Sequence, residues 1–254
     1  MPDVTVTPEA RRVHLKTLSA VLITEGETLR DLMKATAKAR SAPMRTADDA
    51  RSIARAASNT IGETLIATNT RSRSAGLATL RDEYTIARKQ AIEAGVDPLS
   101  LPPQIPAARV HDDEAKAREV ARQAHADMLR QATKILANAE RAKNAYGSDI
   151  LPKYALESIA ATETVNRFHD ERRRAAKQVA ERYKGSNWLP AMLMMHDATL
   201  DVRTCSVCYG LNGKIRPLGL DFGKQLPIHR RCRCARVLIF VLAFLGRKEV
   251  DQAA

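Results

Sequence analysis

The stretch DVRTCSVCYGLNGKIRPLGLDFGKQLPIHRRCRC, residues 201–234, contains all four cysteines of this 254-residue chain. Its cysteines and one histidine follow the pattern C-x2-C, a gap of 20 residues, and then H-x2-C-x-C. In an intracellular protein, clustered cysteines favour a metal site over disulfides. A structural zinc site takes four nitrogen or sulfur ligands. The stretch therefore predicts one structural Zn²⁺ ion.

Five side chains compete for the four ligand positions of this predicted site. We keep Cys234 only as a substitute ligand, because two ligands separated by a single residue would strain the ring that they close with the metal. The predicted ligands are Cys205, Cys208, His229 and Cys232. The alternatives are a set of buried, reduced cysteines or, in an exported protein, two disulfides.

An apolar run of nine residues, Val237 to Leu245, follows the cysteines and ends at Gly246. Its valines, leucines, isoleucine and phenylalanines predict a buried strand. The run has less than half of the roughly 20 residues that a membrane span needs, and the N-terminus lacks the features of a signal peptide. We therefore expect a soluble protein made in a cytoplasm. Its C-terminus is expected to form a small α+β zinc-binding lobe over about 196–246, with one or more short strands.

Helical patterns dominate the chain before this lobe. The first tract begins at Thr7, with Pro8 at the first helical position. Leucines recur in it at seven-residue spacing and predict a helix–helix stripe, interrupted by Gly26. The leucines of this stripe are Leu15, Leu18, Leu22, Leu29 and Leu32.

The second tract begins at Thr46, where Asp49 three residues later has the spacing of a capping box, and it ends at Gly95. Its polar stretch, residues 69–76, is a candidate break. A third helix is predicted over about 113–145 and a fourth over 151–184.

Four prolines within residues 95–112 cannot continue a helix. We interpret this stretch as a linker that separates an N-terminal helical region, residues 1–112, from a second domain, residues 113–254. The predicted fold class is mainly α, with long helices followed by the zinc-binding lobe. The chain is rich in alanine and has only 4% aromatic residues, a composition that favours helices and argues against a purely β protein.

The chain carries 41 Lys and Arg against 29 Asp and Glu, a net charge of +12. This excess favours anionic partners such as nucleic acid or an acidic protein surface, but solvated basic faces would give the same total. The arginine runs 172–174 and 230–236 are candidates for phosphate contacts or for salt bridges to Asp170 and Glu171. Five scattered histidines are expected to be surface or hydrogen-bonded residues rather than ligands: His14, His111, His125, His169 and His196.

Two further patterns accompany the cysteines. Residues 159–167 read IAATETVNR, an I-A-x-T-E…N pattern on the fourth predicted helix, and residues 201–213 and 227–234 read D-x-R-T-C-x-x-C-x-x-L-x-G and P-x-H-x-x-C-R-C. Together these patterns resemble the minor head (head-morphogenesis) proteins of tailed bacteriophages, of the phage Mu F-protein type. The resemblance covers about residues 115–245. It also supports leaving Cys234 out, because the second cysteine of the C-R-C triplet is often replaced in such proteins.

The resemblance implies a structural component of the virion, not an enzyme, that is made in the host cytoplasm and lies in the phage head near the portal vertex. Its implied role is head assembly or the packaging or delivery of DNA. The implied partners are the portal protein, the major capsid protein and, through non-specific contact, packaged DNA, with no membrane. No catalytic and no cofactor-binding residues are assigned.

Two other functions compete with this reading. A zinc-supported DNA-processing enzyme, such as a His–Asn–His nuclease, would need a second His–Asn pair, and a zinc-containing DNA-binding protein would need a recognition helix. The role of Thr162 and Glu163 is also open. They fit a structural role in an amphipathic helix, whereas a catalytic carboxylate would need a partner base and a cleft.

Overall fold

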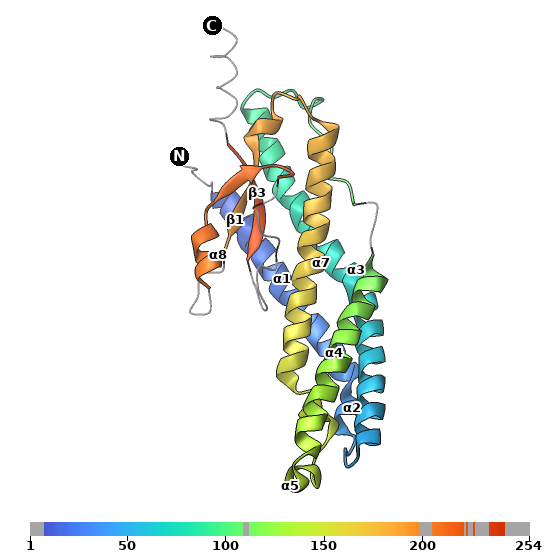
Figure 1. Ribbon diagram of the computed structural model, residues 1–254. Coiled ribbons are helices and arrows are strands. Elements are labelled where there is room, and N and C mark those ends of the chain that lie inside the picture. Colours follow the sequence, from blue (N-terminus) through green and yellow to red (C-terminus); the bar gives the residue numbers. More distant parts are fainter. Residues whose placement is uncertain are drawn as a thin grey trace. The chain divides into compact units, whose positions relative to one another are not determined.

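The computed structural model describes residues 8–108, 112–198, 205–220, 222, 226 and 234–241 (Figure 1). About 70% of the described residues are helical, and the C-terminal part contains a three-stranded antiparallel sheet. The predicted mainly α class with short C-terminal strands is confirmed. None of the described helices is long and apolar enough to cross a membrane.

The chain divides into two compact units, each built from segments that are far apart in the sequence. Unit 1 comprises residues 1–23, 72–109 and 165–254, and unit 2 comprises residues 24–71 and 110–164. Three long helices contribute residues to both units: α1 (Pro8–Ala35), α3 (Ala47–Glu93) and α7 (Lys153–Arg182).

Helix α1 is continuous through Gly26, so the predicted interruption is wrong. The predicted leucine stripe is buried only in part: Leu32 is fully buried and Leu29 packs against the core of unit 2, but Leu15 is 63% and Leu22 is 45% exposed. The buried face of α1 is instead rich in threonine: His14, Thr17, Val21, Thr24, Thr28 and Leu32. Its threonines can be buried because their hydroxyls find acceptors: Thr28 donates to the carbonyl of Thr24 one turn back at 2.9 Å, and Thr17 donates to Glu83 Oε1 of α3 at 2.6 Å.

Helix α3 begins with the predicted capping box. The amide of Asp49 donates to Thr46 Oγ1 at 3.1 Å, and the amide of Thr46 donates to Asp49 Oδ2 at 2.9 Å. The helix does not break at 69–76, because several polar side chains of this stretch are buried in the fold rather than solvated. They are Asn69, Ser72 and Arg73. Gly95, with a φ of +91°, follows the end of α3 as predicted.

Besides its parts of the three long helices, unit 2 contains four further helices among the described residues: α2 (Ala37–Ser41), α4 (Asp113–Leu136), α5 (Ala139–Ala142) and α6 (Gly147–Ile150). The third predicted helix therefore ends at Leu136 instead of 145, and Asn138 caps α5 by accepting from the amide of Arg141. The core of unit 2 is apolar and combines many alanines with a few large side chains. The large ones are Leu32, Met44, Ile61, Leu65, Met128 and Leu156.

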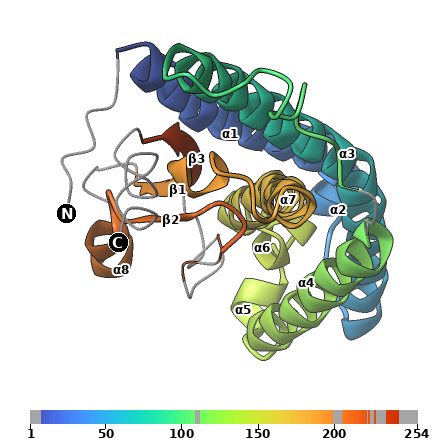
Figure 2. The same ribbon diagram turned by 90° about the horizontal axis from the view of Figure 1, so that it is seen from above.

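Unit 1 contains the sheet, whose strands lie side by side in Figure 2 in the order β2-β1-β3. Its elements are the 3-10 turn η1 (Leu189–Ala191), β1 (Met192–Asp197), α8 (Ser206–Leu211), β2 (Ile215–Pro217) and β3 (Ala235–Phe240). Strand β3 starts two residues before the predicted apolar run and contains its residues 237–240, and it is buried along almost its whole length. The strand prediction is thus confirmed for these residues, and residues 242–245 of the run lie outside the described residues.

The Pro-rich stretch after α3 is not helical, as predicted, and its described part packs against unit 1. Leu101 and Ile105 are buried there. Tyr84 Oη donates to the carbonyl of Pro102 at 2.7 Å, and Arg81 Nε donates to the carbonyl of Ile105 at 2.9 Å. These contacts fix the stretch on unit 1, with Leu101 and Ile105 in its hydrophobic core.

Candidate metal centre

The described residues include three of the five candidate ligands, and His229 and Cys232 lie outside them. Cys208 and Cys234 are buried, and Cys205 is half-buried. All three cysteines belong to or pack against one hydrophobic cluster of unit 1. The other buried members of this cluster are Val21, Val165, Phe168, Ala198 and Leu226. The fold thus gathers cysteines from both halves of the motif.

The C-x2-C half forms a tight turn at the start of α8. Cys205 precedes the first residue of this short helix, and its Sγ accepts a hydrogen bond from the backbone amide of Cys208 at 3.4 Å. An N–H group directed at sulfur favours the thiolate, which is the form that binds metal. This local geometry follows from the sequence, because the two residues between the cysteines complete a single turn.

The loop that follows this turn is fastened to the end of β1. The side-chain oxygen of Asn212 accepts from the amide of Ala198 at 3.0 Å, and the amide of Gly213 donates to the carbonyl of His196 at 2.8 Å. Gly213 has a φ of +74°, a conformation that a residue with a Cβ rarely adopts. These hydrogen bonds hold the chain that follows the C-x2-C turn against β1, the strand that precedes the turn in the sequence.

The pairing of β1 with β3 brings the second half of the motif to the same end of the sheet. The two strands are antiparallel, with Asp197 opposite Ala235. The last residue of β1 therefore faces the first residue of β3, and Cys234 directly precedes that residue. The segment after β1 must therefore begin close to where the segment before β3 ends, although Asp197 and Cys234 are 37 positions apart in the sequence.

His169 of α7 fixes the backbone at Cys234. Its Nε2 lies 3.0 Å from the carbonyl oxygen of Cys234, and because a carbonyl only accepts, Nε2 carries the hydrogen. Burial, followed by the charges of Arg172 and Arg236, holds the pKa of His169 well below its ordinary value. His169 is therefore a neutral, hydrogen-bonded histidine, as the sequence predicted.

His196 is the histidine for which the sequence expectation is wrong. It is fully buried in β1, and neither of its ring nitrogens has a hydrogen-bond partner among the residues that the structure describes. Its ring centre lies 6.0 Å from that of Phe222. Burial, followed by the charge of Arg236, lowers its pKa to about 4. The apolar run Met192–Met195 directly before it was the available signal that this histidine continues a buried strand.

The donor chemistry fits zinc, although the described residues alone do not complete a site. Within them, no group of three or more His, Cys, Asp or Glu side chains is arranged to hold a metal ion. The two cysteines of the C-x2-C turn are soft sulfur donors at a spacing that can bind one ion. Their predicted partners His229 and Cys232 are outside the described residues, so the predicted four-ligand set stays a prediction.

The run of three arginines on α7 is engaged in ion pairs. Arg173 and Arg174 contact Asp170, at 2.8 Å and 3.3 Å, as one of the two sequence interpretations predicted. Arg172 instead pairs with Glu83 of α3 at 2.6 Å, with both side chains almost completely buried. These arginines therefore serve the fold of unit 1.

Thr162 and Glu163 lie on the part of α7 that belongs to unit 2. Glu163 is 5% exposed. Their neighbour Thr164 donates from its hydroxyl to Thr28 Oγ1 of α1 at 3.2 Å. A buried carboxylate beside packed threonines suits a structural role.

No protein-family model, no curated protein and no solved structure matches this chain. The resemblance of the motifs to phage head-morphogenesis proteins therefore stays a prediction from the sequence.

Proposed function

We propose that this chain is a minor head protein of a tailed bacteriophage, a structural component of the virion at or near the portal vertex that serves head assembly or the packaging or delivery of DNA. The proposal rests on the Thr–Glu helix motif and on the two cysteine motifs. One structural observation carries it. The register of β1 and β3 joins the ends of the two segments that contain the cysteine motifs, as a common metal site requires.

In this proposal the zinc is held by Cys205, Cys208, His229 and Cys232, with Cys234 as the substitute ligand. A bound zinc ion would cross-link the segment after β1 to the segment before β3 and would contribute apparent folding free energy on the order of 10 kcal/mol. Such a cross-link suits a lobe that contains a three-stranded sheet with one strand of only three residues.

Residues of the chain itself prepare this cross-link. The amide of Cys208 stabilises the Cys205 thiolate, Asn212 fastens the chain after the turn to β1, and His169 holds the carbonyl of Cys234. A site whose surroundings are ordered by such contacts loses less entropy on binding metal than a flexible one.

The charge distribution supports contact of unit 1 with packaged DNA or with an acidic protein surface. Unit 1 carries 25 Lys and Arg against 14 Asp and Glu, whereas unit 2 carries 16 against 15. Nearly the whole net charge of the chain thus belongs to unit 1. In this proposal the portal protein and the major capsid protein are the protein partners, and contact with DNA is non-specific.

Purified virions and a deletion phage test the function. We expect the chain in purified heads at a copy number far below that of the major capsid protein, together with the portal protein after mild disruption. A phage that lacks the gene should produce defective or empty heads, and expression of the wild-type chain should restore them. Absence from heads, combined with normal infectivity of the deletion phage, would contradict the proposal.

A plasmid-nicking assay with Mg²⁺ or Mn²⁺ separates this role from that of a nuclease. The purified chain should leave supercoiled plasmid intact, and Glu163→Gln should behave as the wild type does. Cleavage that disappears in Glu163→Gln would instead assign a catalytic role to this carboxylate.

A further inference from the structure

Helices α3 and α4 enclose a groove of about 880 Å³ on unit 2, away from the cysteine motifs in the sequence. Its floor consists of small buried residues: Ser58, Gly62 and Ala121. A Cβ added at Gly62 would lie 3.3 Å from the Cβ of Ala121, so the two helices approach closely at this point. Ile66, an exposed apolar side chain, lies at one end of the groove.

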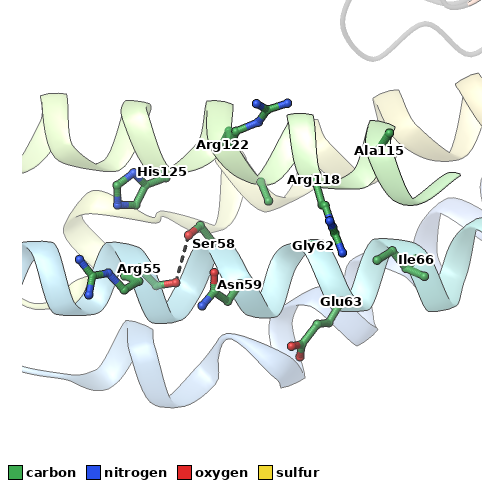
Figure 3. Close-up of a pocket in the computed structure, with 11 residues that line it drawn as sticks. Arg55, Ser58, Asn59, Gly62, Glu63, Ile66, Ala115, Arg118, Arg122 and His125 are labelled. Atoms are coloured by element: carbon green, nitrogen blue, oxygen red, sulfur yellow. Dashed lines mark hydrogen bonds between the residues drawn. The ribbon is translucent and has the colours of Figure 1, made fainter. Parts of the chain in front are cut away.

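The walls of the groove are basic. Three arginines and one histidine line it: Arg55, Arg118, Arg122 and His125. Figure 3 shows Arg118 extending from α4 towards α3 next to Gly62, whereas Glu63, the one acidic lining residue, points away from α4. Arg118 and His125 thus point from α4 towards the floor of small residues, whereas Arg122 points away from α3 in this view.

These cations are available to an anionic partner. Among the described residues, Arg55 forms no ion pair. Arg118 and Arg122 pair with Glu114 and Glu119 of their own helix, but the side chains of both pairs are more than 60% exposed. Exposed ion pairs of this kind contribute little to stability. A carboxylate of a partner can therefore take the place of Glu114 or Glu119 at a small cost in free energy.

The dimensions of the groove correspond to a short helix. Arg55 and Ile66 are eleven residues apart on α3, which is about 16 Å along the helix axis, or about three turns. A helix of that length with small or apolar side chains on one face could pack on the floor. Carboxylates along its flanks would then meet the arginines on the walls.

Nucleic acid fits this groove less well than an acidic helix does. Unit 2 has almost no net charge, with 16 basic against 15 acidic residues, so it lacks the field that draws DNA to a surface. No aromatic side chain lines the groove to stack on a base. The small residues Gly62 and Ala121, together with Ile66, favour a partner that carries an apolar face.

We infer that the α3–α4 groove is a docking site for an acidic amphipathic helix of a partner protein. The inference depends on neither the zinc site nor the role in the phage head, because every residue that carries it belongs to unit 2.

A designed probe tests the docking site. We would titrate the full-length chain into a fluorescein-labelled 14-residue peptide of Ala, Leu and Glu, with an Ala/Leu face and glutamates on both flanks, and measure anisotropy. Saturable binding is expected. Arg118→Glu should weaken it about tenfold, since it replaces an attractive charge with a repulsive one.

Arg130→Glu is the matched control. Arg130 is exposed on the same helix and pairs with Asp127 one turn before it, as Arg118 pairs with Glu114, but it does not line the groove. The control variant should bind the peptide as the wild type does. A peptide with lysines in place of the glutamates should bind Arg118→Glu more tightly than it binds the wild type.

Three outcomes would overturn the inference. The wild type does not bind the acidic peptide, Arg130→Glu weakens binding as much as Arg118→Glu does, or the charge-swapped peptide gains no affinity for Arg118→Glu. Duplex DNA is titrated in parallel. DNA binding that Arg118→Glu abolishes, without binding of the peptide, would assign the groove to nucleic acid and overturn the inference as well.

Discussion

The two units of this chain are stabilised by different kinds of contact. The main hydrophobic cluster of unit 2 contains side chains such as Leu32, Ile61 and Leu65, and its ion pairs, such as Arg71 with Asp31, lie at the surface, although the carboxylate of Glu163 is buried there as well. Unit 1 also has apolar clusters, but charged groups cross them. Helices of similar composition can therefore pack through apolar faces in one region and through buried ions in another.

The centre of unit 1 is the carboxylate of Glu83. Its Oε1 accepts from the hydroxyl of Thr17 at 2.6 Å, and its Oε2 accepts from Arg172 at 2.6 Å and from the amide of Leu238 at 2.7 Å. One side chain of α3 thus contacts α1, α7 and β3. Arg172 continues the network by donating to the carbonyl of Arg236 at 2.7 Å.

The largest expected effect is that of Glu83→Ala. The substitution leaves the buried guanidinium of Arg172 without its carboxylate, which should lower the free energy of unfolding by about 3–5 kcal/mol. Urea denaturation followed by circular dichroism measures the change. Asp48→Ala removes the partner of Arg51 in an exposed pair of unit 2 and should cost less than about 1 kcal/mol. Equal losses in both variants would remove the distinction between the units.

His196 should make the stability of unit 1 depend on pH. Its pKa is about 4 in the folded chain and 6.5 in the reference state, so between these values the unfolded chain binds a proton that the folded chain does not. Stability should therefore fall as the pH decreases from about 6.5 to about 4, by less than Glu83→Ala costs.

His196→Leu removes this titration. We expect the free energy of unfolding of the wild type, relative to that of His196→Leu, to decrease from pH 7 to pH 4.5. Urea denaturation of both proteins at the two pH values measures this change. A difference that stays constant, or that moves in favour of the wild type, would show that the imidazole is not held neutral in the fold.

Two glycines inside long helices should respond oppositely to alanine. A Cβ at Gly76 in unit 1 would lie 2.3 Å from the backbone oxygen of Phe168, whereas a Cβ at Gly26 meets nothing within 4 Å. Gly76→Ala should therefore destabilise the chain by about 1–3 kcal/mol through overpacking. Gly26→Ala should stabilise it by about 0.5–1 kcal/mol, because alanine is the better helix former.

Thermal or chemical denaturation of both variants checks these signs. Stabilisation by Gly76→Ala would mean that α3 and α7 are less closely packed at Phe168 than the structure has them. Destabilisation by Gly26→Ala would mean that α1 bends or is covered at Gly26.

Local signals in the sequence were sufficient to predict where the long helices begin, but the short helices α2, α5, α6 and α8 were not predicted. The capping box of Thr46 and Asp49 and the end of α3 before the positive-φ residue Gly95 depend on neighbouring residues, and both predictions are confirmed. The buried face of α1 could be predicted only at Leu32, because buried threonines such as Thr28, whose hydroxyl donates to the carbonyl of Thr24, occupy positions where a hydrophobic pattern expects leucine. The continuity of α3 through 69–76 likewise depends on ion pairs such as Arg73 with Asp170, 97 residues away.

For the candidate site, spacing alone identified the cysteines, because a C-x2-C turn is a local structure. The register that sets Asp197 opposite Ala235 is a long-range pairing between strands, and β1 itself carried only the short apolar run Met192–Met195 as a signal. His196 was misjudged for the same reason, since its burial follows from that strand.

The most direct test of the account is the zinc content of the purified full-length chain, measured by inductively coupled plasma mass spectrometry after dialysis. We expect about one zinc ion per chain in the wild type and in Cys234→Ser, and loss of the metal in Cys205→Ser, Cys208→Ser and Cys232→Ser. A stably folded wild-type chain without zinc would contradict the account, as would a zinc content that Cys205→Ser leaves unchanged.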